Sequence, residues 1–269
     1  NTLFEPARKL ALEGFTVSPR LASFFEKNGM RLVPSTEEQG PLDAYHYFFD
    51  ENGENRDRLV NPEDAETPRA LRDDPLYLYS GEMAAAIAAA AQQPPRPGTL
   101  TVEDIAAYQP RRLEPLCVEY RELDVCGPPP PASWVAVGMI LGVLENLPFP
   151  SDDRDADWAM FIEAQRLAYA DRDQYVADDS VVDVPLKGLL DPAYLAERAK
   201  LVDPAAALAT VSHGDPWAYE EREAVARFGR DTTLDYAGTT HFVVVDHDGN
   251  AVSMTATVES IFGSARMAG

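Results

Sequence analysis

The sequence predicts an α+β protein that is rich in helix before residue 239 and forms a β-hairpin from there on. Apolar residues recur at helical spacing between capping residues and prolines over much of the first two hundred positions. The stretch from Thr239 to Val258 is instead rich in β-branched residues, with a break at residues 247–249. An apolar content of 45% and a charged content of 25% indicate a globular protein rather than a disordered or fibrous one.

Three helices are predicted in the first half of the chain, with starts at Ser18, Ser80 and Thr101. A hydroxyl side chain at each start is placed to accept a hydrogen bond from an early backbone N–H, and a glycine or a proline follows each helix. Residues 35–75 are acidic, punctuated by proline and weakly periodic. We therefore expect this stretch to lie at the surface, with a hairpin turn at Asn52–Gly53.

The two cysteines flank a second predicted hairpin. A turn at Arg121–Glu122 would place Cys117 opposite Cys126 across two short strands. A disulfide between them would require an oxidising compartment, and the sequence leaves the cytoplasm and the periplasm both open. Because Arg–Glu is a poor turn pair, we expect reduced thiols.

Longer helices are predicted after the proline run at residues 128–131, which we expect to form a rigid corner. They cover about Trp134 to Asn146 and about Trp158 to Tyr175, and a shorter helix covers residues 192–202. Near the end of the second helix, Asp171 directly precedes Arg172. We expect a helix-end salt bridge between these two side chains rather than a catalytic pair.

A three-residue loop with Gly249 at its left-handed position sets the register of the hairpin that follows residue 238. In this register Thr239 lies opposite Thr257, and His241 lies opposite Thr255. These residues share a polar face, whereas the other face is almost wholly apolar and is expected to pack on another part of the protein. We expect His241 to be a hydrogen-bonded structural residue rather than a base.

Several functional classes are disfavoured by composition and spacing. A formal net charge of −22 repels phosphate backbones and anionic lipids, so we expect no nucleic-acid partner. No apolar run approaches the roughly 18 residues of a membrane span. The cysteines match no zinc spacing, and a calcium-loop reading of residues 246–257 fails because Thr257 stands where a bidentate Glu is needed. We therefore expect neither a metal nor a cofactor.

Residues 238–264 read GTTHFVVVDHDGNAVSMTATVESIFGS. This segment closely resembles the site at which gamma-glutamyltranspeptidases, also called glutathione hydrolases, cut themselves and begin the small subunit. Weaker matches occur upstream in the family's order: GFTVS from Gly14, LYSGE from Leu78, LTVEDIAAY from Leu100, PPP from Pro128 and EAQRLAYADR from Glu163. The resemblance implies an N-terminal nucleophile hydrolase with a four-layer αββα sandwich.

The resemblance also implies a division into subunits. Residues 1–238 correspond to the later, mostly helical part of the large subunit, and residues 239–269 to the start of the small one, so that processing would give a heterodimer. Since Asn1 is not an initiator Met and Gly269 interrupts a Gly-rich loop, we expect a piece of a longer protein. The family's early carboxylate-binding Arg and its late Gly-Gly oxyanion site lie outside the sequence, and we expect the piece by itself to be inactive.

Residue roles follow from the same resemblance. Autocleavage would fall between Gly238 and Thr239, after which Thr239 would act as the nucleophile and Thr257 would orient it. Glu259 occupies the position at which the family's transpeptidases typically carry an Asn that helps to bind the α-amino end of the glutamyl group. A solvated charge at the end of the strand is an equally good reading of Glu259, since exposed glutamates are common. The expected substrate is a gamma-glutamyl compound or a related amide, and the expected acyl acceptor is water or an amine.

Two alternatives stay open. Glu259 departs from the family pattern, and PPPPASW, with Ser133 and Trp134, stands where the family has PPPSSGG. These departures are compatible with an amidohydrolase that resembles the β-lactam (cephalosporin) acylase branch. A reading of another class is a non-catalytic, uncleaved acidic interaction module that keeps the hairpin only as structure.

Overall fold

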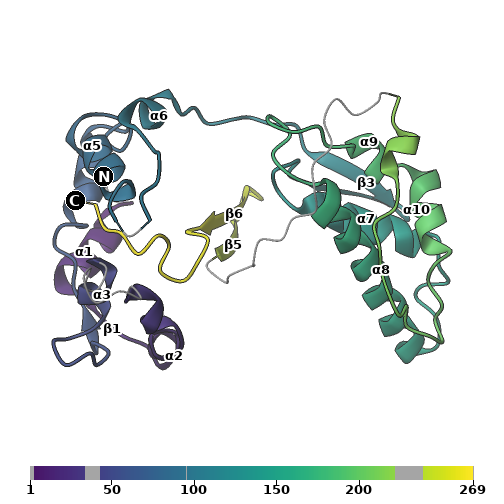
Figure 1. Ribbon diagram of the computed structural model, residues 1–269, viewed down its shortest axis with the longest axis horizontal. Helices are drawn as coiled ribbons and strands as arrows, with labels where there is room; N and C mark the ends of the chain where they lie inside the picture. The colour runs from purple at the N-terminus through teal and green to yellow at the C-terminus, as the bar shows by residue number, and fades with distance from the viewer. Residues whose placement is uncertain (1–2, 34–42, 95, 222–238, 269) are drawn as a thin grey trace. The chain divides into compact units, whose positions relative to one another are not determined.

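The computed structural model describes residues 3–33, 43–94, 96–221 and 239–268. The chain forms two compact units, one of residues 1–110 with 235–269 and the other of residues 111–234 (Figure 1). Neither unit ends at the expected subunit boundary after residue 238, so that division stays a prediction. Strands of the described residues pair into three two-stranded antiparallel sheets among many helices, which confirms the α+β prediction. The described residues do not form all four layers of the αββα sandwich that the resemblance implies.

The first unit contains short helices, two small sheets and a 3₁₀ turn. They are α1 (Glu5–Glu13), β1 (Phe15–Thr16), α2 (Pro19–Asn28), η1 (Gly29–Leu32), α3 (Asp43–Phe48), β2 (Arg58–Leu59), α4 (Glu66–Asp73), α5 (Gly81–Ala91), α6 (Val102–Ala107), β5 (Thr239–Val245) and β6 (Ala251–Thr257). Two of the predicted caps are present: Ser18 Oγ accepts from the Leu21 N–H, and Thr101 and Asp104 form a capping box. Ser80 occupies the N-cap of α5, but its side chain makes no capping bond.

The core of this unit draws on a stretch that we expected to lie at the surface. Ala44, Phe49 and Leu59 are buried in one cluster with Phe25 of α2. The expectation for residues 35–75 is therefore wrong for these apolar residues. Their elements are too short to show a period in the sequence, because each contributes one or two side chains to a core assembled from distant segments.

The second unit is built around a helix pair. Its elements are β3 (Leu116–Tyr120), β4 (Leu123–Gly127), α7 (Trp134–Glu145), α8 (Arg154–Tyr175), α9 (Leu186–Leu189), α10 (Pro192–Ala199) and η2 (Pro216–Tyr219). The core includes Met139 of α7, Met160 of α8 and Leu189 of α9. Helix α8 begins at Arg154, earlier than expected, because the Asp153 carboxylate accepts from the first free N–H groups of the helix.

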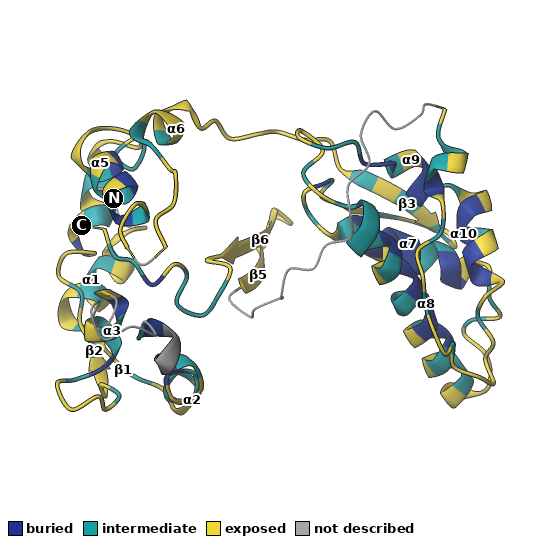
Figure 2. Cartoon of the chain, viewed as in Figure 1, coloured by how far each residue is buried: buried dark blue, intermediate teal, exposed yellow. Residues whose placement is uncertain are grey.

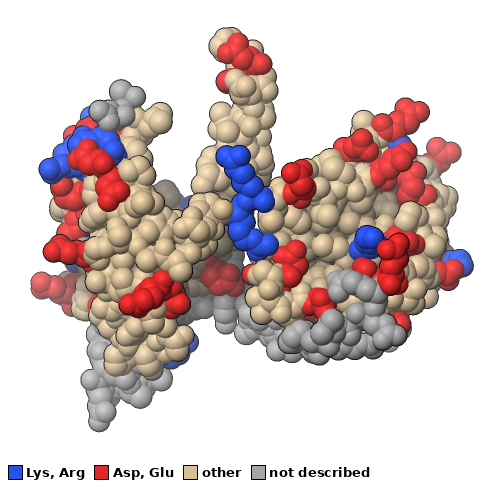
Figure 3. Space-filling model, turned by 90° about the horizontal axis from the view of Figure 1, so that it is seen from above, with Lys and Arg blue, Asp and Glu red and all other residues tan. Residues whose placement is uncertain are grey.

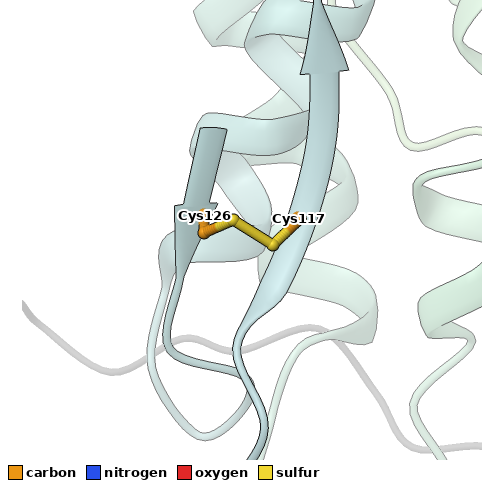
Figure 4. The surroundings of a disulfide bond; sticks show 2 residues. All are labelled: Cys117 and Cys126. Carbon is orange, nitrogen blue, oxygen red and sulfur yellow. A yellow bond between two sulfur atoms is a disulfide. The ribbon is translucent and has the colours of Figure 1, made fainter. Parts of the chain in front are cut away.

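Cys117 and Cys126 are joined by a disulfide, which corrects the expectation of reduced thiols (Figure 4). The two residues lie directly opposite each other in the β3–β4 register, as predicted. Arg121 takes the left-handed conformation that the turn requires, with φ of 59°. Its guanidinium donates to the Phe149 carbonyl at 2.9 Å and lies over the Tyr120 ring, so contacts outside the turn support an unfavourable turn residue.

The surface carries the acidic excess of the sequence. Asp and Glu side chains are spread over the face seen in Figure 3, in keeping with the formal net charge of −22. Of the helices that the structure describes, none is both long and apolar enough to cross a lipid bilayer.

Candidate active site

The β5–β6 hairpin has the register that the sequence predicts. Thr239 pairs with Thr257, and His241 pairs with Thr255. The Asp246 N–H donates to the Asn250 carbonyl at the closed end of the hairpin. Since hydrogen-bonded and non-hydrogen-bonded pairs alternate along an antiparallel ladder, the Thr239 pair is a non-hydrogen-bonded one, in which side chains approach more closely.

The turn of this hairpin is held by one carboxylate. Asp246 Oδ1 accepts from the N–H groups of Asp248 and Asn250, and Oδ2 accepts from the Asn250 side-chain amide at 2.8 Å. Gly249 adopts φ of +84°, the left-handed conformation that the three-residue loop requires at its third position. The hydrogen bonds from the Asn250 side chain and main chain hold the pKa of Asp246 below its ordinary value.

The open end of the hairpin brings two hydroxyl groups together. Thr239 Oγ1 lies 3.0 Å from Thr257 Oγ1, within hydrogen-bond distance. The predicted nucleophile and its predicted orienting partner are therefore in contact across the two strands. Gly238, the residue on the other side of the expected cleavage point, lies outside the described residues.

His241 lies one rung further along the same polar face. Its Nδ1 is 2.8 Å from Thr255 Oγ1, and its Nε2 is 3.3 Å from Ser253 Oγ. Because a hydroxyl both donates and accepts, either tautomer of the ring satisfies both contacts. Both ring nitrogens contact hydroxyl groups of β6 rather than Thr239, in agreement with the structural role expected for this histidine.

Glu259 follows the hairpin in an unusual conformation. Its φ is +68°, in the left-handed region that residues other than glycine and asparagine rarely adopt. The Glu259 N–H donates to Thr257 Oγ1 at 2.9 Å. The third predicted site residue is thus connected to the hydroxyl pair through its main chain, whereas its carboxylate is exposed.

The apolar face of the hairpin is exposed in this structure. Phe242 is 43% exposed, Val244 57% and Met254 48%, and both strands are coloured as exposed in Figure 2. The expected packing of this face on another part of the protein is therefore not found among the described residues.

The second unit contains a buried charged cluster that differs from the sequence-based expectation for Asp171. Asp171 of α8 is only 2% exposed, and its carboxylate accepts from the Tyr194 hydroxyl at 2.8 Å and from the Gly214 N–H at 2.7 Å. Arg198 of α10 forms an ion pair with it at 3.1 Å. Burial raises the pKa of Asp171, and Arg198 opposes that shift. This cluster ties the loop around Gly214 to two helices.

The expected helix-end pair between Asp171 and Arg172 is therefore corrected. Arg172 instead forms an ion pair with Asp173, in which Nη1 lies 3.1 Å from Oδ1, and its Nε donates to Ser133 Oγ at 3.3 Å. A signal for a buried Asp171 does exist in the sequence, since it continues the helical spacing of Ala164, Leu167 and Ala168, which are buried on one face of α8. Its partner Arg198 could not be read from spacing, because it belongs to another helix.

Comparison with known proteins identifies the family of the chain. The family model described as gamma-glutamyltranspeptidase matches residues 1–269. A curated relative, the glutathione hydrolase proenzyme of Escherichia coli, is 32% identical over 276 residues, which cover 100% of this chain and 44% of the relative. The chain thus spans less than half the length of that relative.

Solved structures of similar fold include both a gamma-glutamyltranspeptidase and a cephalosporin acylase. A cephalosporin acylase from Bacillus halodurans matches with a TM-score of 0.76 and 26% identity, over 97% of this chain and 45% of that one. The gamma-glutamyltranspeptidase of Helicobacter pylori matches with a TM-score of 0.68 and 25% identity, over 82% of this chain and 63% of that one. With the family model covering every residue, the chain belongs to the gamma-glutamyltranspeptidase family of N-terminal nucleophile hydrolases.

Proposed function

We propose that the intact protein is an autoprocessed acyltransferase and hydrolase that carries a gamma-glutamyl group on Thr239. The observation that supports this most directly is the hydroxyl pair, with Thr239 at the first position of β5 and 3.0 Å from Thr257. The protein's relatives in Escherichia coli and Bacillus subtilis are glutathione hydrolase proenzymes, which supports maturation by processing. Cleavage would divide the chain into large and small subunits that stay together as a heterodimer.

The processing step uses groups of this chain. Thr239 Oγ attacks the carbonyl carbon of Gly238, the peptide C–N bond breaks as its nitrogen takes up a proton, and water hydrolyses the resulting ester. Gly238 suits a strained scissile bond because it has no Cβ. The product is a Thr239 α-amino group, whose ordinary pKa of about 7.7 to 8.0 allows it to act as a base near neutral pH.

Turnover repeats the same chemistry on a free substrate. The α-amino group takes the proton of the Thr239 hydroxyl as Oγ bonds to the γ-carbonyl carbon, and the departing amine takes a proton. Water or an amine acceptor then releases the acyl group from Thr239. Thr257 keeps the Oγ atom in place through both steps by its hydrogen bond.

The identity of the acyl group depends on Glu259. A carboxylate here would attract the α-ammonium of a gamma-glutamyl group, but it would repel the α-carboxylate of the same group. At 4 Å and an effective dielectric constant of 20 that repulsion is about 4 kcal/mol. An acylase-like function on other amides is therefore the second candidate, supported by the structural likeness to the cephalosporin acylase.

Intact mass of the purified full-length protein tests the proposal. The wild type is expected to give two chains divided before Thr239, and Thr239→Ala is expected to give one chain without activity. Thr240→Val is a matched control, because it removes the neighbouring hydroxyl from the opposite face and should be processed normally. A processed, fully active Thr239→Ala protein would overturn the proposal, and a wild type that stays whole and inactive would favour the interaction module.

Comparison of two substrates separates the enzymatic candidates. A gamma-glutamyl anilide carries both the α-ammonium and the α-carboxylate, whereas a glutaryl amide lacks the ammonium. Higher kcat/KM for the anilide is expected from the transferase function, and a preference for the glutaryl amide would assign the protein to the acylase-like function.

A further inference from the structure

The main chain of Glu259 is part of the hydroxyl arrangement at the candidate site. Thr257 Oγ1 accepts from the Glu259 N–H at 2.9 Å and lies 3.0 Å from Thr239 Oγ1. A hydroxyl oxygen offers two acceptor positions, and the N–H fills one of them. The contact therefore fixes the side-chain rotamer of Thr257, and with it the place from which Thr257 reaches the nucleophile.

Residues after Glu259 are attached to the core of the first unit. Phe262 packs on Phe25 and Phe48, with ring centroids 6.2 Å and 5.2 Å apart. Ala265 is buried, and its carbonyl accepts from the Ala44 N–H. The chain between the open end of the hairpin and this anchor turns at Glu259, the residue with φ of +68°.

These contacts place opposite demands on one residue. The Glu259 N–H must stay on Thr257, while the chain that leaves its Cα must turn toward the Phe262 anchor. A left-handed φ satisfies both demands at once. A residue that avoids positive φ would have to move either the N–H away from Thr257 or the anchored segment away from the core.

We propose that the Glu259 main chain, through its left-handed turn and its N–H, positions Thr257 and so aligns the Thr239 nucleophile. This role rests on the proposed function and is separate from any contact of the Glu259 side chain with a substrate. Glu259 is in this respect a positioning residue. Its side chain affects the affinity for the acyl group, and its main chain affects the rate of the chemical steps.

Variants at this position separate the two roles in the full-length protein. Glu259→Gly removes the carboxylate but adopts positive φ freely, and Glu259→Val removes the carboxylate and disfavours positive φ. We expect the two variants to share the same change in KM for a gamma-glutamyl anilide. The rate of autoprocessing and kcat are expected to be at least about tenfold lower in Glu259→Val than in Glu259→Gly.

Arg121→Val is the control in the other unit, because it introduces valine at φ of 59° in the β3–β4 turn and also removes the Arg121 contacts with Phe149 and Tyr120. It is expected to lower the melting temperature without slowing autoprocessing, which separates a local effect at the hydroxyl pair from general destabilisation. If Glu259→Val does not fold, Glu259→Ala replaces it, with a kcat about fivefold or more below that of Glu259→Gly.

Equal kcat and equal processing rates in the glycine variant and in the valine or alanine variant would overturn the positioning role. Failure of the proposed function has a different signature, since the wild type itself would then be neither processed nor active.

Discussion

Replacement of Thr257 by valine is the most direct perturbation of the hydroxyl pair. Valine keeps the β-branched shape and the strand preference of threonine but removes Oγ1, the atom that lies 3.0 Å from Thr239 Oγ1 and 2.9 Å from the Glu259 nitrogen. Thr257→Ser is the matched variant, because it keeps the hydroxyl and loses only a methyl group. The hairpin register should be the same in both variants.

The expected loss follows from the partial negative charge that Thr239 Oγ carries as the base removes its proton. A hydrogen bond to a charged group contributes about 1.5 to 3 kcal/mol. At 1.36 kcal/mol for each factor of ten, its removal corresponds to a fall in kcat of about 10- to 150-fold. KM should change little, because Thr257 contacts the nucleophile rather than the acyl group.

The assay has two readouts on the full-length protein. Release of aniline from a gamma-glutamyl anilide gives kcat and KM, and intact mass against time gives the rate of autoprocessing. Thr257→Ser should retain most of both rates, and Thr257→Val should lose them together. A Thr257→Val protein within threefold of the wild type in both rates would refute the orienting role of this hydroxyl.

Three further predictions concern contacts inside the individual units. Asp171→Asn should lower the free energy of unfolding in urea by about 3 to 5 kcal/mol, because Arg198 is left as a buried unpaired charge; adding Arg198→Met should restore part of the loss, and a cost below about 1 kcal/mol would contradict the assignment. Because the pKa of Asp246 is lowered on folding, its carboxylate stabilises the hairpin above its unfolded pKa, and this contribution is lost as pH falls through the folded pKa. Its carboxyl group should therefore titrate below 3.8 by NMR, and a midpoint at or above that value would count against the turn contacts. Serine at both Cys117 and Cys126 should cost about 2 to 3 kcal/mol in the chain-entropy model, and an unchanged unfolding midpoint under oxidising conditions would contradict it.

Local sequence patterns determined much of what the structure contains. The register that places Thr239 opposite Thr257 follows from strand alternation and from one glycine in a three-residue loop. The pairing of Cys117 with Cys126 follows in the same way from a two-residue turn, although the oxidation state expected for them was wrong. These features depend on residues that are neighbours along the chain, so their geometry is limited by a few allowed backbone conformations.

Only the tertiary structure decided the remaining features of the site and its support. Asp171 found its partner Arg198 in another helix, and the turn at Glu259 became left-handed where the hairpin meets a segment anchored by Phe262. Such contacts join residues that are far apart in the sequence, so they leave no periodic pattern in it. Their geometry is set by how whole elements pack. A left-handed glutamate in particular is contrary to its local preference, and it persists because contacts on both sides of the residue outweigh that preference.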